Sequence, residues 1–142
     1  MKILPAALLL VVVLACSAPS NRQKLAEPEK GYRGMTGAIL QYSEPIVKRT
    51  SDRFFELRGE VTNLSSEDLG TVWVYVRFYD NSNGYISSRK YAVENWPVGP
   101  REKTTYDYQF EYDPKISRHE IQFLDSDGAV IPSEVIPRKR NK

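Results

Sequence analysis

The single histidine and the single cysteine of this 142-residue chain restrict the covalent chemistry that it can perform. Acyl-transfer catalysis needs a nucleophile, a base and a group that orients the base. In residues 119–124, every second side chain falls on the same side of an extended chain: His119, Ile121 and Phe123. This is the pattern of side chains packed in a strand. Zinc sites need three or four His, Cys or carboxylate ligands. We therefore expect no catalytic residue, no metal site and no enzymatic activity.

Two oxygen-rich segments have the residue types of calcium loops without the full spacing. Residues 80–84 (DNSNG) and 125–128 (DSDG) each begin with a carboxylate. A complete calcium loop of the EF-hand type needs a Glu at its twelfth position, where these segments have Tyr91 and Ile136. Asp and Asn also favour turns, because their side chains hydrogen-bond to the nearby backbone. Both segments are predicted to be turns.

Aromatic side chains, which make up 11% of the sequence, are the remaining candidates for contacts with a ligand. Flat rings on a sheet can stack on sugars or anchor a protein partner. The alternative is that they fill the space between sheets, as aromatic rows commonly do in sandwiches. The candidates for an exposed binding patch are Trp73, Tyr85, Tyr91 and Trp96.

Positive charge is concentrated at the C-terminus of the chain. The last five residues include Arg138, Lys139, Arg140 and Lys142. Without these four and Lys2, 15 basic residues remain against 18 acidic ones, so the body of the protein is near −3. A basic end attracts anionic surfaces such as a membrane, although such ends are often simply solvated. The basic segment is short, and we expect no nucleic-acid partner.

The elements that position these residues are predicted to be β-strands. Residues 53–63 alternate between apolar and polar side chains, which indicates a strand with one exposed face. Residues 72–79 are bulky on both faces, which predicts a strand at the centre of its sheet. Five further extended runs bring the total to about seven: 38–47, 85–93, 106–112, 119–124 and 129–136. No helical period is visible, so residues 37–137 are predicted to form an all-β, antiparallel β-sandwich.

The N-terminus has the features of an export signal. An apolar run from residue 3 to residue 15 follows Lys2 and precedes Cys16. It is shorter than the roughly 20 residues of a transmembrane helix and matches the apolar region of a signal peptide, roughly 7–15 residues. Residues 13–16 (VLAC) resemble the lipobox of bacterial lipoproteins. The alternative is an uncleaved signal anchor with an incidental cysteine.

The lipobox resemblance implies that residues 1–15 are removed and that Cys16 carries a diacylglyceryl thioether and an N-acyl chain. Two or more acyl chains give stable membrane anchoring, and this covalent lipid is the only cofactor expected. Residues 16–36 are polar, with Pro and Gly, and are predicted to be a flexible tether. The position after Cys16 is Ser17 rather than the Asp that commonly retains lipoproteins at the inner membrane. The expected location is the cell envelope, at the outer membrane where one exists.

The pattern Phe55-x-Leu57-x-Gly59-x-Val61 is followed by alternating residues from Val72 to Phe78 and by the aromatic run 106–110. This arrangement resembles the FxLYD-type immunoglobulin-like domains of bacterial envelope proteins over residues 53–112, with Val76 at the position of the motif's Phe. The resemblance implies an immunoglobulin-like, extracytoplasmic and non-catalytic module.

Two functional hypotheses follow from the anchor and the sandwich. The first is a membrane-anchored lipoprotein that presents its sandwich to another envelope protein, as an assembly subunit or an accessory factor. The second is a carbohydrate- or peptidoglycan-binding module that uses exposed aromatic residues.

Overall fold

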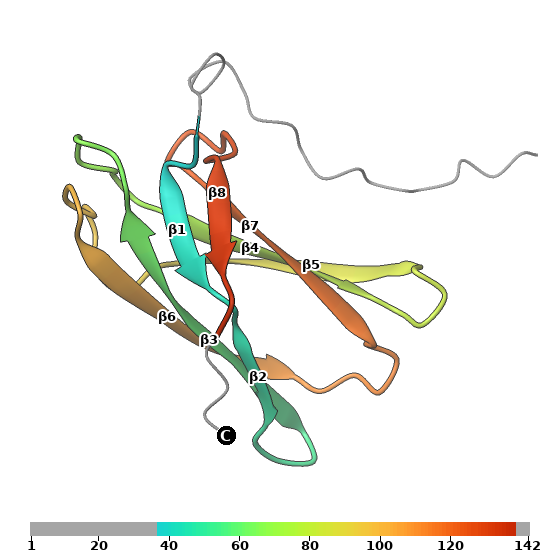
Figure 1. The fold of residues 1–142 in the computed structure, drawn as a ribbon. Helices are drawn as coiled ribbons and strands as arrows, with labels where there is room; N and C mark the ends of the chain where they lie inside the picture. Colours follow the sequence, from blue (N-terminus) through green and yellow to red (C-terminus); the bar gives the residue numbers. More distant parts are fainter. Residues whose placement is uncertain (1–36, 139–142) are drawn as a thin grey trace, which may run out of the picture.

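The computed structural model describes residues 37–138, which form two packed β-sheets and contain no helix (Figure 1). This confirms the predicted all-β sandwich. The strands are β1 (Leu40–Ser43), β2 (Ile46–Arg49), β3 (Phe54–Asn63), β4 (Trp73–Tyr79), β5 (Tyr85–Ala92), β6 (Lys103–Glu111), β7 (Arg118–Leu124) and β8 (Ser133–Ile136). The predicted signal peptide, Cys16, the tether, Lys139, Arg140 and Lys142 lie outside the described residues.

The chain changes sheets repeatedly as it passes from strand to strand. One sheet contains β1, β2, β3, β6 and β8, and the other has the order β5-β4-β7. The longest pairing joins β3 and β6 in antiparallel register from Phe54↔Glu111 to Thr62↔Lys103. The strand β4 lies at the centre of its sheet, as its two bulky faces predict. The strands β3 and β6 thus lie in one sheet, and β4 and β7 lie in the other. The corresponding strands of immunoglobulin-like sandwiches are distributed in the same way.

The run 38–47, predicted as a single strand, is instead two short strands on one edge of β3. The register changes from Tyr42↔Val61 in β1 to Ile46↔Arg58 in β2, so one extra residue lies between them. Pro45 lies in this gap, and its missing N–H prevents a continuous ladder. The break is therefore a bulge in one predicted strand, which raises the strand count to eight.

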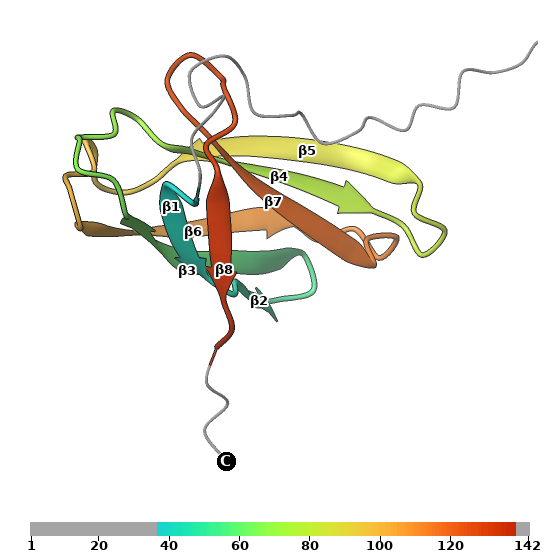
Figure 2. The same cartoon turned by 45° about the horizontal axis from the view of Figure 1, so that its top comes forward.

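The last strand changes sheets. After a single bridge between Leu124 and Val130, the chain leaves β7, and β8 pairs with β1 in parallel register from Leu40↔Ser133 to Ser43↔Ile136. Figure 2 shows β8 running down from the sheet of β7 to the sheet of β1. In an immunoglobulin-like sandwich the last strand usually lies beside the preceding one. Here most of that edge of β7 has no neighbouring strand among residues 37–138.

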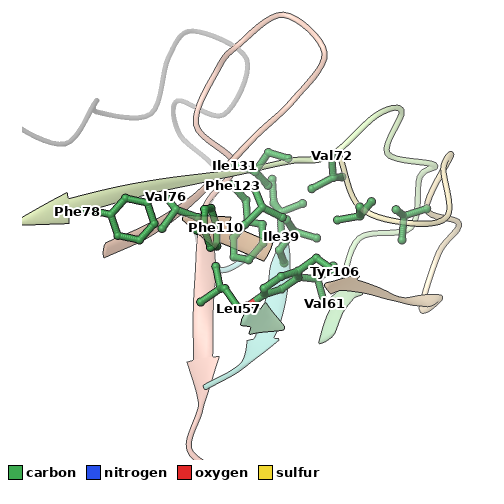
Figure 3. Close-up of a cluster of buried hydrophobic side chains, with 14 of the residues drawn as sticks. Ile39, Leu57, Val61, Val72, Val76, Phe78, Tyr106, Phe110, Phe123 and Ile131 are labelled. Carbon is green, nitrogen blue, oxygen red and sulfur yellow. The ribbon is translucent and has the colours of Figure 1, made fainter. Parts of the chain in front are cut away.

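The core lies between the sheets and consists of the inward side chains of both (Figure 3). The predicted alternation in β3 is confirmed, because Phe55, Leu57 and Val61 are buried whereas Arg58 and Glu60 are exposed. A cluster of three rings closes one end of the core, with centroids between 5.1 and 5.8 Å apart: Phe55, Phe78 and Phe110. Burial of apolar surface, at about 25 cal/mol per Å², is the main source of stability.

Candidate functional site

An aromatic row runs along the outward side of β4. Trp73, Tyr75 and Tyr79 share this side because side chains alternate along a strand, and the valines between them enter the core. The pairing registers place side chains of β5 and β7 on both sides of the row. We call this set the outer aromatic face: Trp73, Tyr75, Arg77, Tyr79, Tyr85, Ser88, Lys90, Arg118 and Glu120.

A cation covers each of the three rings on the outward side of β4. Lys90 Nζ lies 4.8 Å from the centroid of Trp73, and Arg77 Cζ lies 5.1 Å from that of Tyr75. The guanidinium of Arg118 lies 4.2 Å from the centroid of Tyr79. Each such contact contributes about 0.5–1 kcal/mol at an exposed site. These contacts give the face a mixed aromatic and basic character.

Hydrogen bonds fix the tyrosine hydroxyls of this face. The Tyr79 hydroxyl donates to Glu120 Oε2 at 3.0 Å, and Ser88 Oγ lies 3.2 Å from the Tyr75 hydroxyl and 3.1 Å from that of Tyr85. Arg118 also pairs with Glu120. Partial burial raises the pKa of Glu120, but hydrogen bonds from Arg118 and Tyr79 outweigh it and lower the pKa overall. Glu120 is therefore ionised at neutral pH.

Arg77 is buried in the middle of the face, between two tyrosines of its own strand. Its burial opposes the charged form, but hydrogen bonds with Tyr75 and Tyr79 outweigh this effect and raise the pKa of Arg77. The same face thus contains a buried cation whose guanidinium lies over the ring of Tyr75. Sequence reasoning did not identify Lys90 or Arg118, because their roles depend on the registers of β5 and β7. It did not single out Arg77 either, although alternation along β4 already places this residue between Tyr75 and Tyr79.

The four aromatic residues predicted for a binding patch do not form one patch. Trp73 is half-buried on the outer aromatic face, and Tyr85 is 37% exposed at its edge, where its ring meets Tyr79 edge-on at 6.2 Å. Tyr91 lies on the inward side of β5 and stacks on Tyr108 at 4.2 Å, so it is not part of an exposed patch. Trp96, 61% exposed, lies in the loop between β5 and β6.

The first carboxylate of each oxygen-rich segment caps its own turn. Asp80 Oδ1 accepts hydrogen bonds from the N–H groups of Ser82 and Gly84, and Asp125 Oδ1 does the same within its own turn. Both predicted turns are therefore confirmed. Within residues 37–138, no group of three or more His, Cys, Asp or Glu side chains could hold a metal ion. In this same range, no helix is long and apolar enough to cross a membrane.

His119 lies beside a small cavity at one end of the sandwich. The cavity, of about 190 Å³, is formed where β2, β3, β4 and β7 meet the loop between β6 and β7, and Phe55, Phe78 and Ile116 line it. Burial lowers the pKa of His119, and the charge of Arg118 adds to the effect. The half-buried imidazole is therefore neutral at pH 7 and packs in its strand.

No protein-family model and no curated protein sequence matches the chain. Among solved structures, the chain is similar to IrmA from Escherichia coli, with a TM-score of 0.50 and 12% identity over 75% of this chain and 96% of IrmA. It is also similar to the alkylpurine DNA glycosylase AlkC of Pseudomonas fluorescens bound to DNA, with a TM-score of 0.44 and 13% identity over 67% of this chain and 29% of AlkC. The likeness to IrmA concerns the fold alone.

Proposed function

We propose that this chain is a lipid-anchored protein of the bacterial cell envelope whose β-sandwich binds another envelope protein, without catalysis. The observation that carries the proposal is the outer aromatic face, where three rings of β4 point outward beneath cations. Trp73 and Tyr75 are half-buried, whereas Tyr79 is buried. The resemblance of residues 13–16 to a lipobox supports the anchor, and residues 16–36 supply the length of a tether.

The composition of the outer aromatic face suits a protein partner. Trp, Tyr and Arg are the residue types that contribute most to binding energy at protein interfaces. The rings are already held by cations and hydrogen bonds, so binding would order few additional side chains. Such pre-organisation lowers the entropic cost of association, which is about 0.5–1.5 kcal/mol for each side chain that must be immobilised.

Site-specific photo-crosslinking in intact cells tests the proposed surface. A benzophenone amino acid at position 90 lies on the outer aromatic face, and the same group at position 109 lies on the outward side of β6, in the other sheet. We expect a defined protein adduct from position 90, weakened by Trp73→Ala, and none from position 109. Equal adducts from both positions, or none from position 90, would contradict the proposal.

The anchor has its own test, which is independent of the partner. A Cys16→Ser variant should lose labelling by an alkyne fatty acid and should leave the membrane fraction. A matched Ser17→Ala variant changes the neighbouring residue and should keep both properties. If the Cys16→Ser protein remains membrane-bound and functional, lipidation is not the basis of its action.

One observation favours a second candidate function, the binding of carbohydrate or peptidoglycan. Trp96 is 61% exposed, the largest exposed fraction among the large apolar residues of the described range 37–138. An exposed ring of this kind can stack on a sugar. Retention on purified peptidoglycan should then depend on Trp96 and not on Trp73. Absence of retention by peptidoglycan and by other glycans would exclude this function.

A further inference from the structure

The edge of β7 that faces away from β4 is open along most of its length. The Ile131 N–H donates to the Phe123 C=O at 2.9 Å, and the chain then departs toward β1. Backbone groups of alternate residues point to the same edge of a strand. The N–H and C=O of Ile121 and His119 therefore point to this edge, where residues 37–138 supply no further strand. An open edge is a template for an added strand.

The small cavity described above lies directly beside this edge. Ser117, Arg118 and His119 form one of its walls, and Val47 of β2, itself 45% exposed, forms another. Pockets for small-molecule ligands are about 300–1,000 Å³, whereas this one is about 190 Å³. Its size suits a single large apolar side chain, and a strand added to β7 would direct alternate side chains toward it.

The rim of the cavity carries the cation of Arg49. The other cation that lines the cavity, Arg118, already pairs with Glu120, and Asp113 adds a carboxylate. The guanidinium of Arg49 lies 4.2 Å from the ring centroid of Tyr112, so it is held at the rim. The present partner of Arg49 is Asp52, whose side chain is fully exposed, so an acidic side chain next to the apolar one would compete for this arginine.

We propose that β7 binds an extended segment of a partner protein, which adds to the sheet as a further strand. One large apolar side chain of that segment fills the cavity, and an acidic side chain lies beside Arg49. Main-chain hydrogen bonds supply affinity in such complexes, and pockets for alternate side chains supply specificity. The inference rests on the proposed function, since the added strand would extend the outer aromatic face next to Arg118 and Glu120.

Binding of a defined peptide to the full chain in detergent tests the inference. The probe is acetyl-TVTLTET-amide, in which the valine, leucine and glutamate share one side when the peptide is extended. We expect slower amide hydrogen exchange in residues 118–123 with no change in β5. Replacing the leucine by alanine should weaken binding at least tenfold, and an Arg49→Ala variant of the protein should weaken it severalfold.

Backbone pairing is tested by two N-methylated forms of the same peptide. Each form carries methyl groups on one of the two alternating sets of amides, and only one set can face β7. We expect one form to lose binding at least tenfold and the other to bind like the parent. Equal behaviour of the two forms would overturn the proposal, because contact through side chains alone does not distinguish them.

Variants at position 119 test the same contact from the protein side. His119→Pro removes an N–H that points to the open edge, a position where edge strands tolerate proline, whereas His119→Ala keeps it. Both variants remove the imidazole from the cavity wall, so they differ only in the backbone N–H. We expect the proline variant to bind the peptide at least tenfold more weakly than the alanine variant, and equal binding would overturn the proposal. If a second copy covers β7, residues 118–123 are already protected without peptide and lose protection on dilution, which overturns the proposal. The crosslink from position 90 tests the outer aromatic face, so its outcome is independent of these peptide-binding results.

Discussion

The ring of Tyr106 lies against the backbone of Gly59, its partner across the β3–β6 pair. A Cβ atom at position 59 would overlap the Tyr106 hydroxyl and would lie 2.6 Å from its Cζ. Tyr106 is fully buried, and burial is the main cause that raises the pKa of its hydroxyl. The glycine is therefore required by the packing of this ring, in the middle of the longest strand pair.

We expect Gly59→Ala to destabilise the fold by about 1–3 kcal/mol, the range typical of overpacked cores. The cause is the overlap with Tyr106, so adding Tyr106→Leu to Gly59→Ala should restore part of the lost free energy of unfolding. Urea unfolding measures both effects. Gly70→Ala is the matched control, because a Cβ at position 70 has no neighbour within 4 Å. A loss as large at position 70 as at position 59 would contradict this explanation.

Asn63 should not tolerate replacement by its isosteric acid. Its buried side-chain amide donates to the carbonyl oxygens of Glu67 at 2.7 Å and Val98 at 2.9 Å, while its Oδ1 accepts from the N–H of Ser65. Asp has no donor to offer these carbonyls, so we expect Asn63→Asp to cost about 2–4 kcal/mol. Chemical denaturation at pH 7 measures the loss. The exposed Asn81→Asp should change stability by less than about 0.5 kcal/mol.

The hydrogen bond between Tyr79 and Glu120 should appear as a coupling energy. We expect a double-mutant cycle of Tyr79→Phe and Glu120→Gln to give about 1 kcal/mol, because the acceptor is charged and only partly exposed. The Arg49–Asp52 pair is the comparison, since the side chain of Asp52 is fully exposed. Asp52→Ala should cost little, as exposed pairs usually do. A coupling near zero for Tyr79 and Glu120 would show that the contact does not stabilise the fold.

The stability of the sandwich should decrease in mildly acidic solution because of His119. Burial holds its pKa below the usual value, so the unfolded chain takes up a proton at a higher pH than the folded one. Stability is then lost as the pH falls below the unfolded pKa of about 6.5, and the loss ends below the folded pKa. His119 is the only histidine of the chain. His119→Gln should therefore remove most of the change in unfolding free energy between about pH 7.5 and pH 5.5.

The strands were predictable because the side-chain period of two depends only on neighbouring residues. The partners of the strands depend on contacts far apart in the sequence, and these were not predictable. Pro45 marks the break between β1 and β2, but a proline alone does not say whether the two halves stay on one edge of β3. The parallel pairing of β8 with β1 joins residues about 93 positions apart and has no local signal.

The aromatic candidates illustrate the same limit. Tyr85 and Tyr91 are six positions apart and would face the same side of a regular strand. A bulge in the β4–β5 pair shifts the register between Phe78 and Tyr79, so Tyr85 lies beside Tyr79 while Tyr91 lies beside Val74. One irregular residue thus places one tyrosine on the outer aromatic face and the other between the sheets. The outward position of Trp73 was predictable, because it alternates with the valines of β4 and therefore lies on the opposite face of the strand.

The parallel pairing of β1 and β8 also determines how the sandwich would bear mechanical load. The described chain enters at the start of β1 and leaves at the end of β8, which are opposite ends of this strand pair. Tension between the two ends of the chain would slide the strands past each other and strain their hydrogen bonds together, whereas an antiparallel hairpin would open one bond at a time. A protein pulled between an anchor at one end and a load at the other would thus load this strand pair in shear.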